Sequence, residues 1–318
     1  MILAVGLFVL GLFLIIKGGD WFVEAAGWLA EISGIPRVII GATVVSIATT
    51  LPELLVSLFA ALDGKVAMAV GNAVGSVNAN IGLIMAVSLI WAPSVFRRKT
   101  LAVKALMMLA ACILLWFFTC NGLLSLGGSL ILLLLFFCFI GESVRGAKKS
   151  REPALQLSFT RTSVWGNVGK FVFGAAAIVV GAQLLVDNGS QIALYLGVSE
   201  AVIGVTIVAV GTSLPELVTA ITSLVKKQAD LSVGNIIGAN IIDLTMILPL
   251  CALVSGGQLP VSRQSVILDM PVSILLVILA VLPPLFFGRF RQSQGLLLLL
   301  LYIAYILVVS TGYVLVFL

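Results

Sequence analysis

Two acidic motifs in the chain carry residue types that can bind a metal cation. The first, ATTLPELLVS, contains Glu53, and the second, VGTSLPELVT, contains Glu216. Hydroxyl side chains lie about one helical turn before each acid: Thr49 and Thr50 in the first motif, and Thr212 and Ser213 in the second. Carboxylate and hydroxyl oxygens suit hard cations such as Ca²⁺, Mg²⁺ and Na⁺, so the pair of motifs predicts a cation site.

Further polar residues follow each motif, in GNAVGSVNANIG from Gly71 and GNIIGANIIDLT from Gly234. The four-residue spacing places Asn72, Ser76 and Asn80 on one helix face, as it does Asn235, Ala239 and Asp243. Together Glu53, Glu216 and Asp243 can offset the charge of one divalent ion or several monovalent ions. The alternatives are protonated acids bonded to a neighbouring helix, hydroxyls bonded to their own helix and glycines that serve packing alone.

The composition places these residues inside a lipid bilayer. Of the 318 residues, 61% are hydrophobic and 10% charged, with a mean hydropathy of +1.24, whereas soluble domains carry about 25% charged residues. Ten apolar runs are long enough to span a membrane: 2–30, 38–61, 66–92, 101–120, 123–142, 166–195, 201–225, 231–254, 266–287 and 294–317. The sequence therefore predicts an all-α integral membrane protein with ten transmembrane helices.

Each acidic motif lies within one of these spans, directly after a proline. Because proline has no N–H, Pro52 should free the carbonyl of Ala48, and Pro215 that of Gly211. In hydrocarbon such a carbonyl needs a partner, and a bound ion is a natural one. A buried acid is likewise costly, so Glu53 and Glu216 are expected to be functional.

The two motifs belong to an internal repeat. The offset that aligns Glu53 with Glu216, called the repeat offset below, also pairs Gly71, Asn72 and Gly75 with Gly234, Asn235 and Gly238, and Asn80 with Asp243. Each half holds five spans, an odd number, so the halves should cross the membrane in opposite directions, as in many secondary transporters. We expect a first repeat in 1–142, a cytoplasmic linker in 143–164 and a second repeat in 165–318.

Basic residues indicate the orientation of the chain. With the N-terminus outside, the inward loops hold nearly all of the Lys and Arg residues, Lys104 among them, whereas the outward loops hold only Lys65 and Arg263. The positive-inside rule then places both termini on the outer side of the cytoplasmic (inner) membrane. The first run is interpreted as a retained span and not a signal peptide. The basic residues do not gather on a soluble face, so a nucleic-acid partner is not expected.

The other acids and the cysteines are expected to have no part in the site. Glu24 and Asp187 align at the repeat offset; an interfacial role is expected for them, and a gate or a helix-packing role is the alternative. The remaining acids, Asp20, Glu31, Asp63, Glu142, Glu152, Glu200, Asp230 and Asp269, fall near span ends and are expected to be solvated. The four cysteines, Cys112, Cys120, Cys138 and Cys251, have no CxxC spacing, and the chain has no histidine, so small packing residues are expected and not a zinc site or disulfide framework.

The motifs resemble those of the sodium/calcium exchanger superfamily, particularly its compact prokaryotic members, whose repeats read G-x-T-x-x-A-x-G-T-S-x-P-E and then G-N-x-x-G-S-N-x-x-N/D. The resemblance implies that the second, third, seventh and eighth of ten helices surround the ions. It implies these ligands: the carboxylates of Glu53 and Glu216; hydroxyl or carbonyl groups of Thr49, Thr50, Thr212 and Ser213; Ser76, Asn80 and Asp243; and the carbonyls of Ser46 and Ala209.

The sequence departs from the family pattern at several positions. Ala239 stands where the second repeat usually has serine, which removes a hydroxyl that the resemblance implies for Na⁺. Ala48, Thr50 and Val77 replace a glycine, a serine and an asparagine of the first repeat. The short linker leaves no room for a large calcium-sensing domain.

These features predict an antiporter that exchanges Ca²⁺ for Na⁺ by alternating access, with the first and sixth spans sliding past a fixed site. A Ca²⁺/H⁺ or other cation/H⁺ antiporter and a cation channel are the alternatives. An enzyme is not expected, because the chain has no histidine, no nucleophile beside a base and no GxxxxGK loop. No cofactor is expected; the partners are the lipid bilayer and inorganic cations, and a monomer could suffice.

Overall fold

The computed structural model describes residues 2–92, 98–149, 161–196, 211 and 213–310, and nearly all of them are helical. The first half holds α1 (Ile2–Ser33), α2 (Arg37–Ile40), α3 (Ser46–Thr49), α4 (Leu51–Leu62), α5 (Val66–Ala79), α6 (Ala86–Trp91), α7 (Arg98–Thr119) and α8 (Leu126–Lys149). The second holds α9 (Arg161–Tyr195), α12 (Leu214–Val225), α13 (Ala229–Ile242), α14 (Leu248–Val254), α15 (Met270–Phe287) and α16 (Gln292–Ser310). Helices satisfy their own backbone hydrogen bonds, as a chain in lipid requires.

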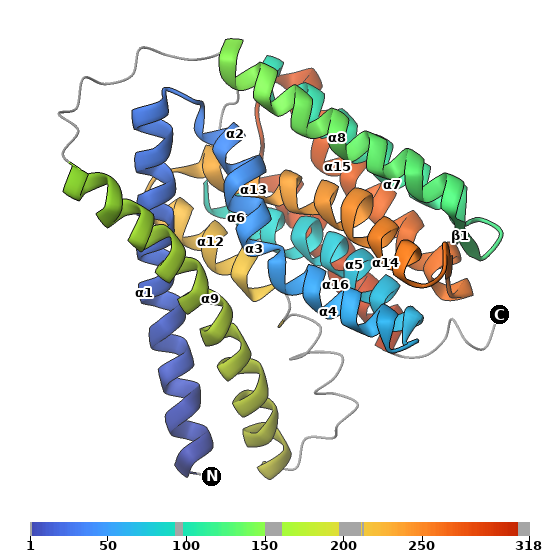
Figure 1. Ribbon diagram of the computed structural model, residues 1–318, viewed down its shortest axis with the longest axis horizontal. Helices are drawn as coiled ribbons and strands as arrows, with labels where there is room; N and C mark the ends of the chain where they lie inside the picture. Colours follow the sequence, from blue (N-terminus) through green and yellow to red (C-terminus); the bar gives the residue numbers. More distant parts are fainter. Residues whose placement is uncertain (1, 93–97, 150–160, 197–210, 212, 311–318) are drawn as a thin grey trace.

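The described residues include four π-helical turns, of which the first three each join two helices into a longer one and the fourth leads into α15. They are η1 (Gly41–Val45), η2 (Asn80–Met85), η4 (Asp243–Ile247) and η5 (Ser265–Asp269). Two short strands, β1 (Leu123–Ser125) and β2 (Gln258–Pro260), pair antiparallel with Leu124 opposite Leu259. This pairing joins the loop after α7 to the loop after α14, so it links the two halves of the chain (Figure 1).

Eight helices of the described part are long and apolar enough to cross a membrane, and a ninth is added if α2–α3 and α4 count as one bent span. The predicted span 201–225 is represented by α12 alone, because 201–210 and 212 lie outside the described residues. The protein is thus a multi-span membrane protein, and its tenth span remains a prediction. The predicted linker is partly helical, since α8 continues to Lys149 and α9 begins at Arg161.

The repeat predicted from the sequence is visible in the local structure. Helix α12 begins and ends at the residues that the repeat offset pairs with the ends of α4, and α13 is related to α5 in the same way. The π-helical turns η2 and η4 start at Asn80 and Asp243, which are also paired at this offset. Equivalent sequences therefore form equivalent helix breaks in the two halves.

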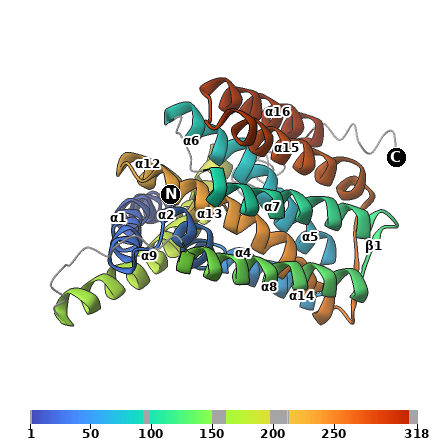
Figure 2. The same ribbon diagram turned by 90° about the horizontal axis from the view of Figure 1, so that it is seen from above.

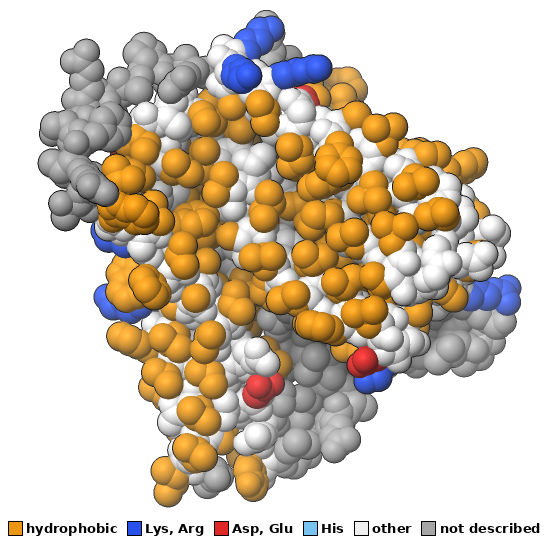
Figure 3. All heavy atoms as spheres, viewed as in Figure 1, with side chains coloured by type: hydrophobic (Ala, Val, Ile, Leu, Met, Phe, Trp, Pro, Cys, Tyr) orange, Lys and Arg blue, Asp and Glu red, His pale blue; other side chains and the backbone are white. Residues whose placement is uncertain are grey.

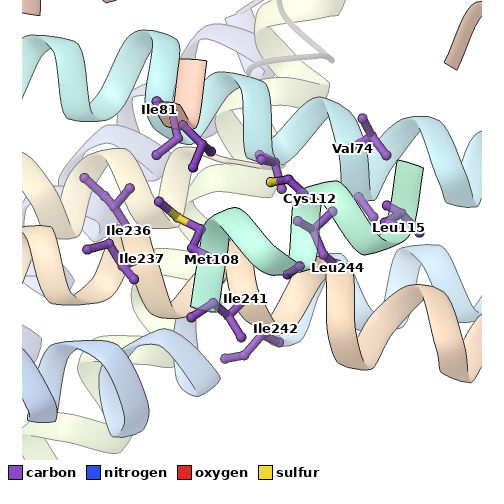
Figure 4. Packing of buried hydrophobic residues seen from close by; sticks show 14 of the residues in the cluster. Val74, Ile81, Met108, Cys112, Leu115, Ile236, Ile237, Ile241, Ile242 and Leu244 are labelled. Carbon is purple, nitrogen blue, oxygen red and sulfur yellow. The ribbon is translucent and has the colours of Figure 1, made fainter. Parts of the chain in front are cut away.

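The middle of the molecule is formed by α5, α13 and their π-helical extensions. Every residue of α13 from Leu231 to Ile242 is buried. Figure 4 shows Ile236, Ile237 and Ile241 packing near Met108 and Cys112 of α7. Outside this core, large apolar side chains such as Phe117 and Phe137 are exposed. Apolar side chains cover most of the face seen in Figure 3, as expected for a surface in contact with lipid.

Helices α1 and α9 lie side by side at one edge of the molecule (Figures 1 and 2). Their contact depends on glycine, because a Cβ added at Gly18 would lie 2.8 Å from the carbonyl oxygen of Gly174. The same distance separates a Cβ at Gly11 from the carbonyl oxygen of Gly181. Small residues at these points allow the two backbones to approach closely, a common packing mode in membranes.

Lys104 lies in the helical core, although the sequence suggests a loop. It is 1% exposed, lies on α7 and donates a 2.8 Å hydrogen bond to Glu142 Oε2 and another to Ser143 on α8. Its ammonium also lies 5.1 Å from the centre of the Phe139 ring. The expectation of a solvated Glu142 is thus wrong in one respect, since this carboxylate is the counter-ion of a buried lysine.

The cysteines divide into two pairs. All four are free thiols; Cys112 and Cys251 are buried in the core, whereas Cys120 and Cys138 are exposed. The packing role expected from the sequence therefore fits the first two.

The close approach of α1 and α9 predicts a position-specific effect of alanine. Gly18→Ala should lower the free energy of unfolding by about 1–3 kcal/mol, because the added methyl group meets backbone atoms that cannot move aside. Gly6→Ala on the same helix is the control: a Cβ there meets nothing within 4 Å, so this variant should be neutral or slightly stabilised. Thermal melting in detergent compares the two, and equal melting temperatures would contradict the packing argument.

Candidate cation site

The helix that carries Glu53 is broken just before the acid. The axes of α2–α3 and α4 differ by 45°. At the break the N–H of Thr50 donates to the carbonyl of Ser46 (2.9 Å), and the N–H of Leu54 donates to the carbonyl of Thr50 (3.0 Å). Pro52 has no N–H to give to the carbonyl of Ala48. The break places Glu53 in the first turn of α4, where the positive end of the helix dipole favours a carboxylate.

The second motif has the same local arrangement. Ser213 is the N-cap residue of α12, and Glu216 lies in its first turn. Both sequences, Thr50 to Glu53 and Ser213 to Glu216, match the capping box, in which hydroxyl and carboxylate bond to the backbone at the helix start. Neither Thr50 nor Ser213 makes such a bond. The side chains suited to capping are therefore free for another role.

Contacts across the repeat bring the two motifs together. The hydroxyl of Thr50 donates to Glu216 Oε1 at 3.4 Å, and that of Thr49 lies 3.3 Å from Asn235 Oδ1. The amide of Asn80 donates to Asn240 Oδ1 at 2.9 Å. The carboxyl groups of Glu53, Glu216 and Asp243 also interact electrostatically with one another. Residues from the two halves of the chain thus surround one region.

Several oxygens in this region are buried without a hydrogen-bond partner in the described part of the chain. They are Oε2 of Glu53, Oε2 of Glu216, both carboxyl oxygens of Asp243, Oδ1 of Asn80, Oγ of Ser76 and Oγ of Ser213. All six side chains are at most 4% exposed. Buried polar atoms normally have partners, and leaving one unsatisfied costs about 1–3 kcal/mol. A cluster of such oxygens is suited to a ligand that accepts lone pairs, such as a cation.

The geometry of this cluster limits how a cation can be held. Among the described residues, no three His, Cys, Asp or Glu side chains lie close enough together to bind one metal ion. Neutral oxygens beside the carboxylates would therefore complete the coordination of an ion here. Hydroxyl, amide and carbonyl oxygens beside carboxylates are the ligand set of Ca²⁺ and Na⁺.

The remaining sequence candidates differ in their surroundings. Ser46 is fully buried, but its hydroxyl donates to the carbonyl of Thr43 (3.1 Å). Its own carbonyl already accepts from the N–H of Thr50 and, at 3.3 Å, from the hydroxyl of Thr49. Ala209 and Thr212 lie outside the described residues.

Other polar residues inside the helix bundle are not among the ligands expected from the sequence. Asn72 of α5 donates to Ser57 Oγ (2.9 Å) and to the carbonyl of Glu53 (3.4 Å). These bonds hold α5 against the start of α4, where the first motif lies. Thr219 and Ser223 of α12 are fully buried, and neither hydroxyl has a partner in the described residues. Their sequence spacing from Glu216 was a usable signal, because it places all three on one helix face.

The expectation that Asp269 is solvated is wrong. It is 6% exposed and accepts a 3.1 Å hydrogen bond from the hydroxyl of Tyr305 on α16. Its backbone carbonyl accepts from the amide of Asn78 on α5 (3.1 Å) and from the hydroxyl of Ser273 (2.9 Å). This network fastens the C-terminal end of α5, just before Asn80, to α15 and α16.

These observations define a multi-span membrane protein in which two repeated motifs, each at the start of a helix, meet around buried carboxyl groups. A family model described as sodium/calcium exchanger protein matches residues 3–144 and 167–311. The chain belongs to this family.

Individual relatives cover most of the chain. It is 37% identical to the inner membrane protein YrbG of Escherichia coli over 81% of this chain and 82% of the relative. It is 30% identical to the sodium/calcium exchanger MaX1 of Methanosarcina acetivorans over 94% of this chain and 96% of the relative. A solved structure of the sodium-calcium exchanger NCX_Mj, soaked with Na⁺ and Ca²⁺, is 33% identical and superposes with a TM-score of 0.84 over 96% of this chain and 98% of that one.

The unpartnered oxygens predict that cations stabilise the fold. A saturating concentration of Ca²⁺, about 100 times its Kd, should raise the free energy of unfolding by about 2.7 kcal/mol, because the folded state alone offers the cluster. In Asp243→Asn the gain should be smaller, since a carboxylate near the ion is lost. Melting in detergent with Ca²⁺ or choline chloride measures both effects. Equal stabilisation of the parent protein and Asp243→Asn would exclude Asp243 from the site.

Proposed function

We propose that the protein is an antiporter of the cytoplasmic membrane that exchanges Ca²⁺ for Na⁺ by alternating access. The observation that carries the proposal is the set of buried, unpartnered oxygens contributed by both repeats, on Glu53, Glu216, Asp243, Asn80, Ser76 and Ser213. Family membership supports a cation exchanger, and two relatives, MaX1 and NCX_Mj, are named as sodium/calcium exchangers.

The proposed ligands fall into three groups. Glu53, Glu216 and Asp243 supply negative charge. Neutral side-chain oxygens come from Thr49, Thr50, Ser76, Asn80, Thr212 and Ser213, and backbone carbonyls come from Ser46 and Ala209. In this assignment Ca²⁺ lies between Glu53 and Glu216, and the neutral oxygens complete its coordination.

Exchange follows from the charge of the site. Three carboxyl groups in a low-dielectric region are costly when ionised without a counter-ion. The empty site therefore opposes the crossing of an unloaded carrier, whereas Ca²⁺ or several Na⁺ ions relieve the cost. Two kinds of cation that compete for the same oxygens then cross in opposite directions.

The proposed architecture is ten spans in two inverted five-helix repeats, with both termini outside. The movable part is the α1–α9 pair, which contacts the site-bearing helices along one side only. An ion pair joins Asp20 of α1 to Lys226 after α12 (3.4 Å), and another joins Glu24 of α1 to Lys170 of α9 (2.6 Å). The second pair holds the two movable helices together; the first must break when α1 slides along α12.

A Ca²⁺/H⁺ antiporter is the second candidate, and one observation favours it. In the described residues no Lys or Arg forms an ion pair with Glu53, Glu216 or Asp243. A carboxyl group without a counter-ion in such surroundings tends to hold a proton. Protons are thus the natural competitors of the metal ion if Na⁺ is not.

Transport in liposomes separates the candidates. Purified protein should take up Ca²⁺ when Na⁺ is loaded inside and diluted outside, and uptake should fall at least about tenfold in Glu53→Gln and in Glu216→Gln, because each loses a charged ligand. Asp63→Asn is the control, since its carboxylate is exposed in the turn after α4 and pairs only loosely with Lys65 (3.9 Å). Uptake that follows a pH gradient and ignores Na⁺ would replace Na⁺ with H⁺ in the proposal.

Ala239 allows a test of the sodium positions. It is fully buried at the position equivalent to Ser76, and a hydroxyl there would add a neutral oxygen on the second repeat. Ala239→Ser should lower the Na⁺ concentration for half-maximal exchange by roughly two- to tenfold, on the scale of one added hydrogen-bonding group. The Ca²⁺ dependence should change less. Equal shifts for both ions would mean that position 239 does not distinguish them.

A further inference from the structure

A line of buried hydroxyls leads away from Glu216 along α12. Thr219 and Ser223 lie on the same helix face as Glu216, and both are fully buried. With a rise of about 1.5 Å per residue, Ser223 lies about 10 Å along the helix from Glu216. That distance is a large part of the way from the middle of a bilayer to its surface.

These hydroxyls differ from other buried hydroxyls in the protein. Thr119, Thr245 and Ser88 each donate to the carbonyl four residues earlier, the usual way to satisfy a hydroxyl inside a membrane helix. Thr219 and Ser223 make no such bond and have no other partner in the described part. Their oxygens thus lack the partners that a purely structural role would provide.

Neighbouring helices continue the polar line. Ser232 of α13 is fully buried, and its hydroxyl lies 3.5 Å from that of Ser88 on α6. One turn further along α13 is Asn235, whose Nδ2 has no partner in the described residues and whose Oδ1 contacts Thr49 at the site. Helices α6 and α12 end, and α13 begins, at the same end of the molecule, the one that the sequence predicts to be cytoplasmic.

The other half of the protein lacks this line. At the repeat offset, Thr219 and Ser223 correspond to Val56 and Ala60, and Ser232 corresponds to Ala69. Ser88 corresponds to Cys251. The equivalent side chains of the other repeat are therefore apolar or a thiol wherever this line has hydroxyls, although the backbone of α4 and α5 matches that of α12 and α13.

Helix α1 packs against the connection between α12 and α13. The side chain of Gln228, the N-cap residue of α13, lies so close to Gly27 that a Cβ there would be 2.6 Å from its Nε2. The Asp20–Lys226 ion pair fastens the same connection to α1. Movement of α1 would therefore uncover this end of α12 and α13.

We infer that Thr219, Ser223, Ser232 and Ser88 form the route by which partly hydrated cations pass between the site and the α12–α13 end of the molecule. Their oxygens replace part of the water shell of the ion. The ion accepts lone pairs from Thr219 and Ser223, whose hydroxyls have no partner in the described part. Ser88 offers a lone pair while its hydroxyl still donates to the carbonyl of Ile84. The inference rests on the proposed function for the identity of the cargo, but the route itself is a property of α6, α12 and α13.

Thiol labelling tests the route independently of transport. In protein lacking its four natural cysteines, Ser223→Cys in liposomes should react with a membrane-impermeant trimethylammonium methanethiosulfonate added at the α12–α13 side. The reaction should be about tenfold or more faster than for Val233→Cys, because modification requires access. Val233 is the matched control, because it is buried on α13 at the same end of the molecule but turned away from Ser232 by one residue. Equal rates for the two cysteines, under Na⁺ and Ca²⁺ gradients of both directions, would overturn the inference.

Transport measurements give a second test. Thr219→Val and Ser223→Ala should slow Ca²⁺ exchange about tenfold, the scale of one lost bond to a charged group, while the Kd for Ca²⁺ stays within about twofold. Thr119→Val, which removes a buried hydroxyl bonded within its own helix, should leave the rate unchanged. An unchanged rate in both route variants, or a Kd that weakens in step with the rate, would contradict the route. A protein that moves no Ca²⁺ at all but labels at position 223 would refute the proposed function and leave the route intact.

Discussion

A carboxyl group inside a hydrocarbon layer must be neutralised, and the surroundings of Glu53 and Glu216 follow from this constraint. Each acid is 1% exposed and lies in the first turn of a half-helix, where the helix dipole offers partial compensation. That dipole alone does not satisfy the second carboxyl oxygen of either residue, which has no partner in the described structure. The remaining compensation must come from a bound ion or a proton.

The helix breaks are a consequence of the same constraint. In an unbroken helix, the carbonyls would all accept hydrogen bonds from their own helix, and the acids would lie in its middle, far from any helix terminus. Pro52 and Pro215 create a terminus at membrane depth, and the capping-box residues placed there do not cap. Helices α5 and α13 pack against α4 and α3 on either side of the break, and a membrane tolerates broken backbone where protein covers it.

Local features of the fold could be predicted from the sequence. The proline breaks, the constant repeat offset and the four-residue spacing of Ser76 and Asn80 are local patterns, and the structure shows the corresponding helix ends and π-helical turns. Features that depend on packing between distant segments could not be predicted. The burial of Asp269 requires Asn78 and Tyr305, and the burial of Lys104 requires α8 to lie beside α7. Hydropathy alone assigns such charges to span ends.

Prediction of the candidate site from the sequence was limited in the same way, because the bonding of its hydroxyls depends on packing. Spacing places Thr219 and Ser223 on the face of Glu216, but a membrane hydroxyl normally bonds to its own helix, so this signal is not decisive without the structure. Only their missing bonds distinguish them from Thr245 or Thr119.

The short β1–β2 ribbon has a mechanical consequence. It ties the α7–α8 loop to the loop that follows α14, so helices from both halves are held at a fixed separation at one end of the bundle. Helices α1 and α9 have no such tie in the part of the chain that the structure describes, and they pack chiefly against each other through glycines. In the proposed mechanism the helices tied by the ribbon stay fixed, and α1 and α9, packed against each other through glycines, move together as one unit.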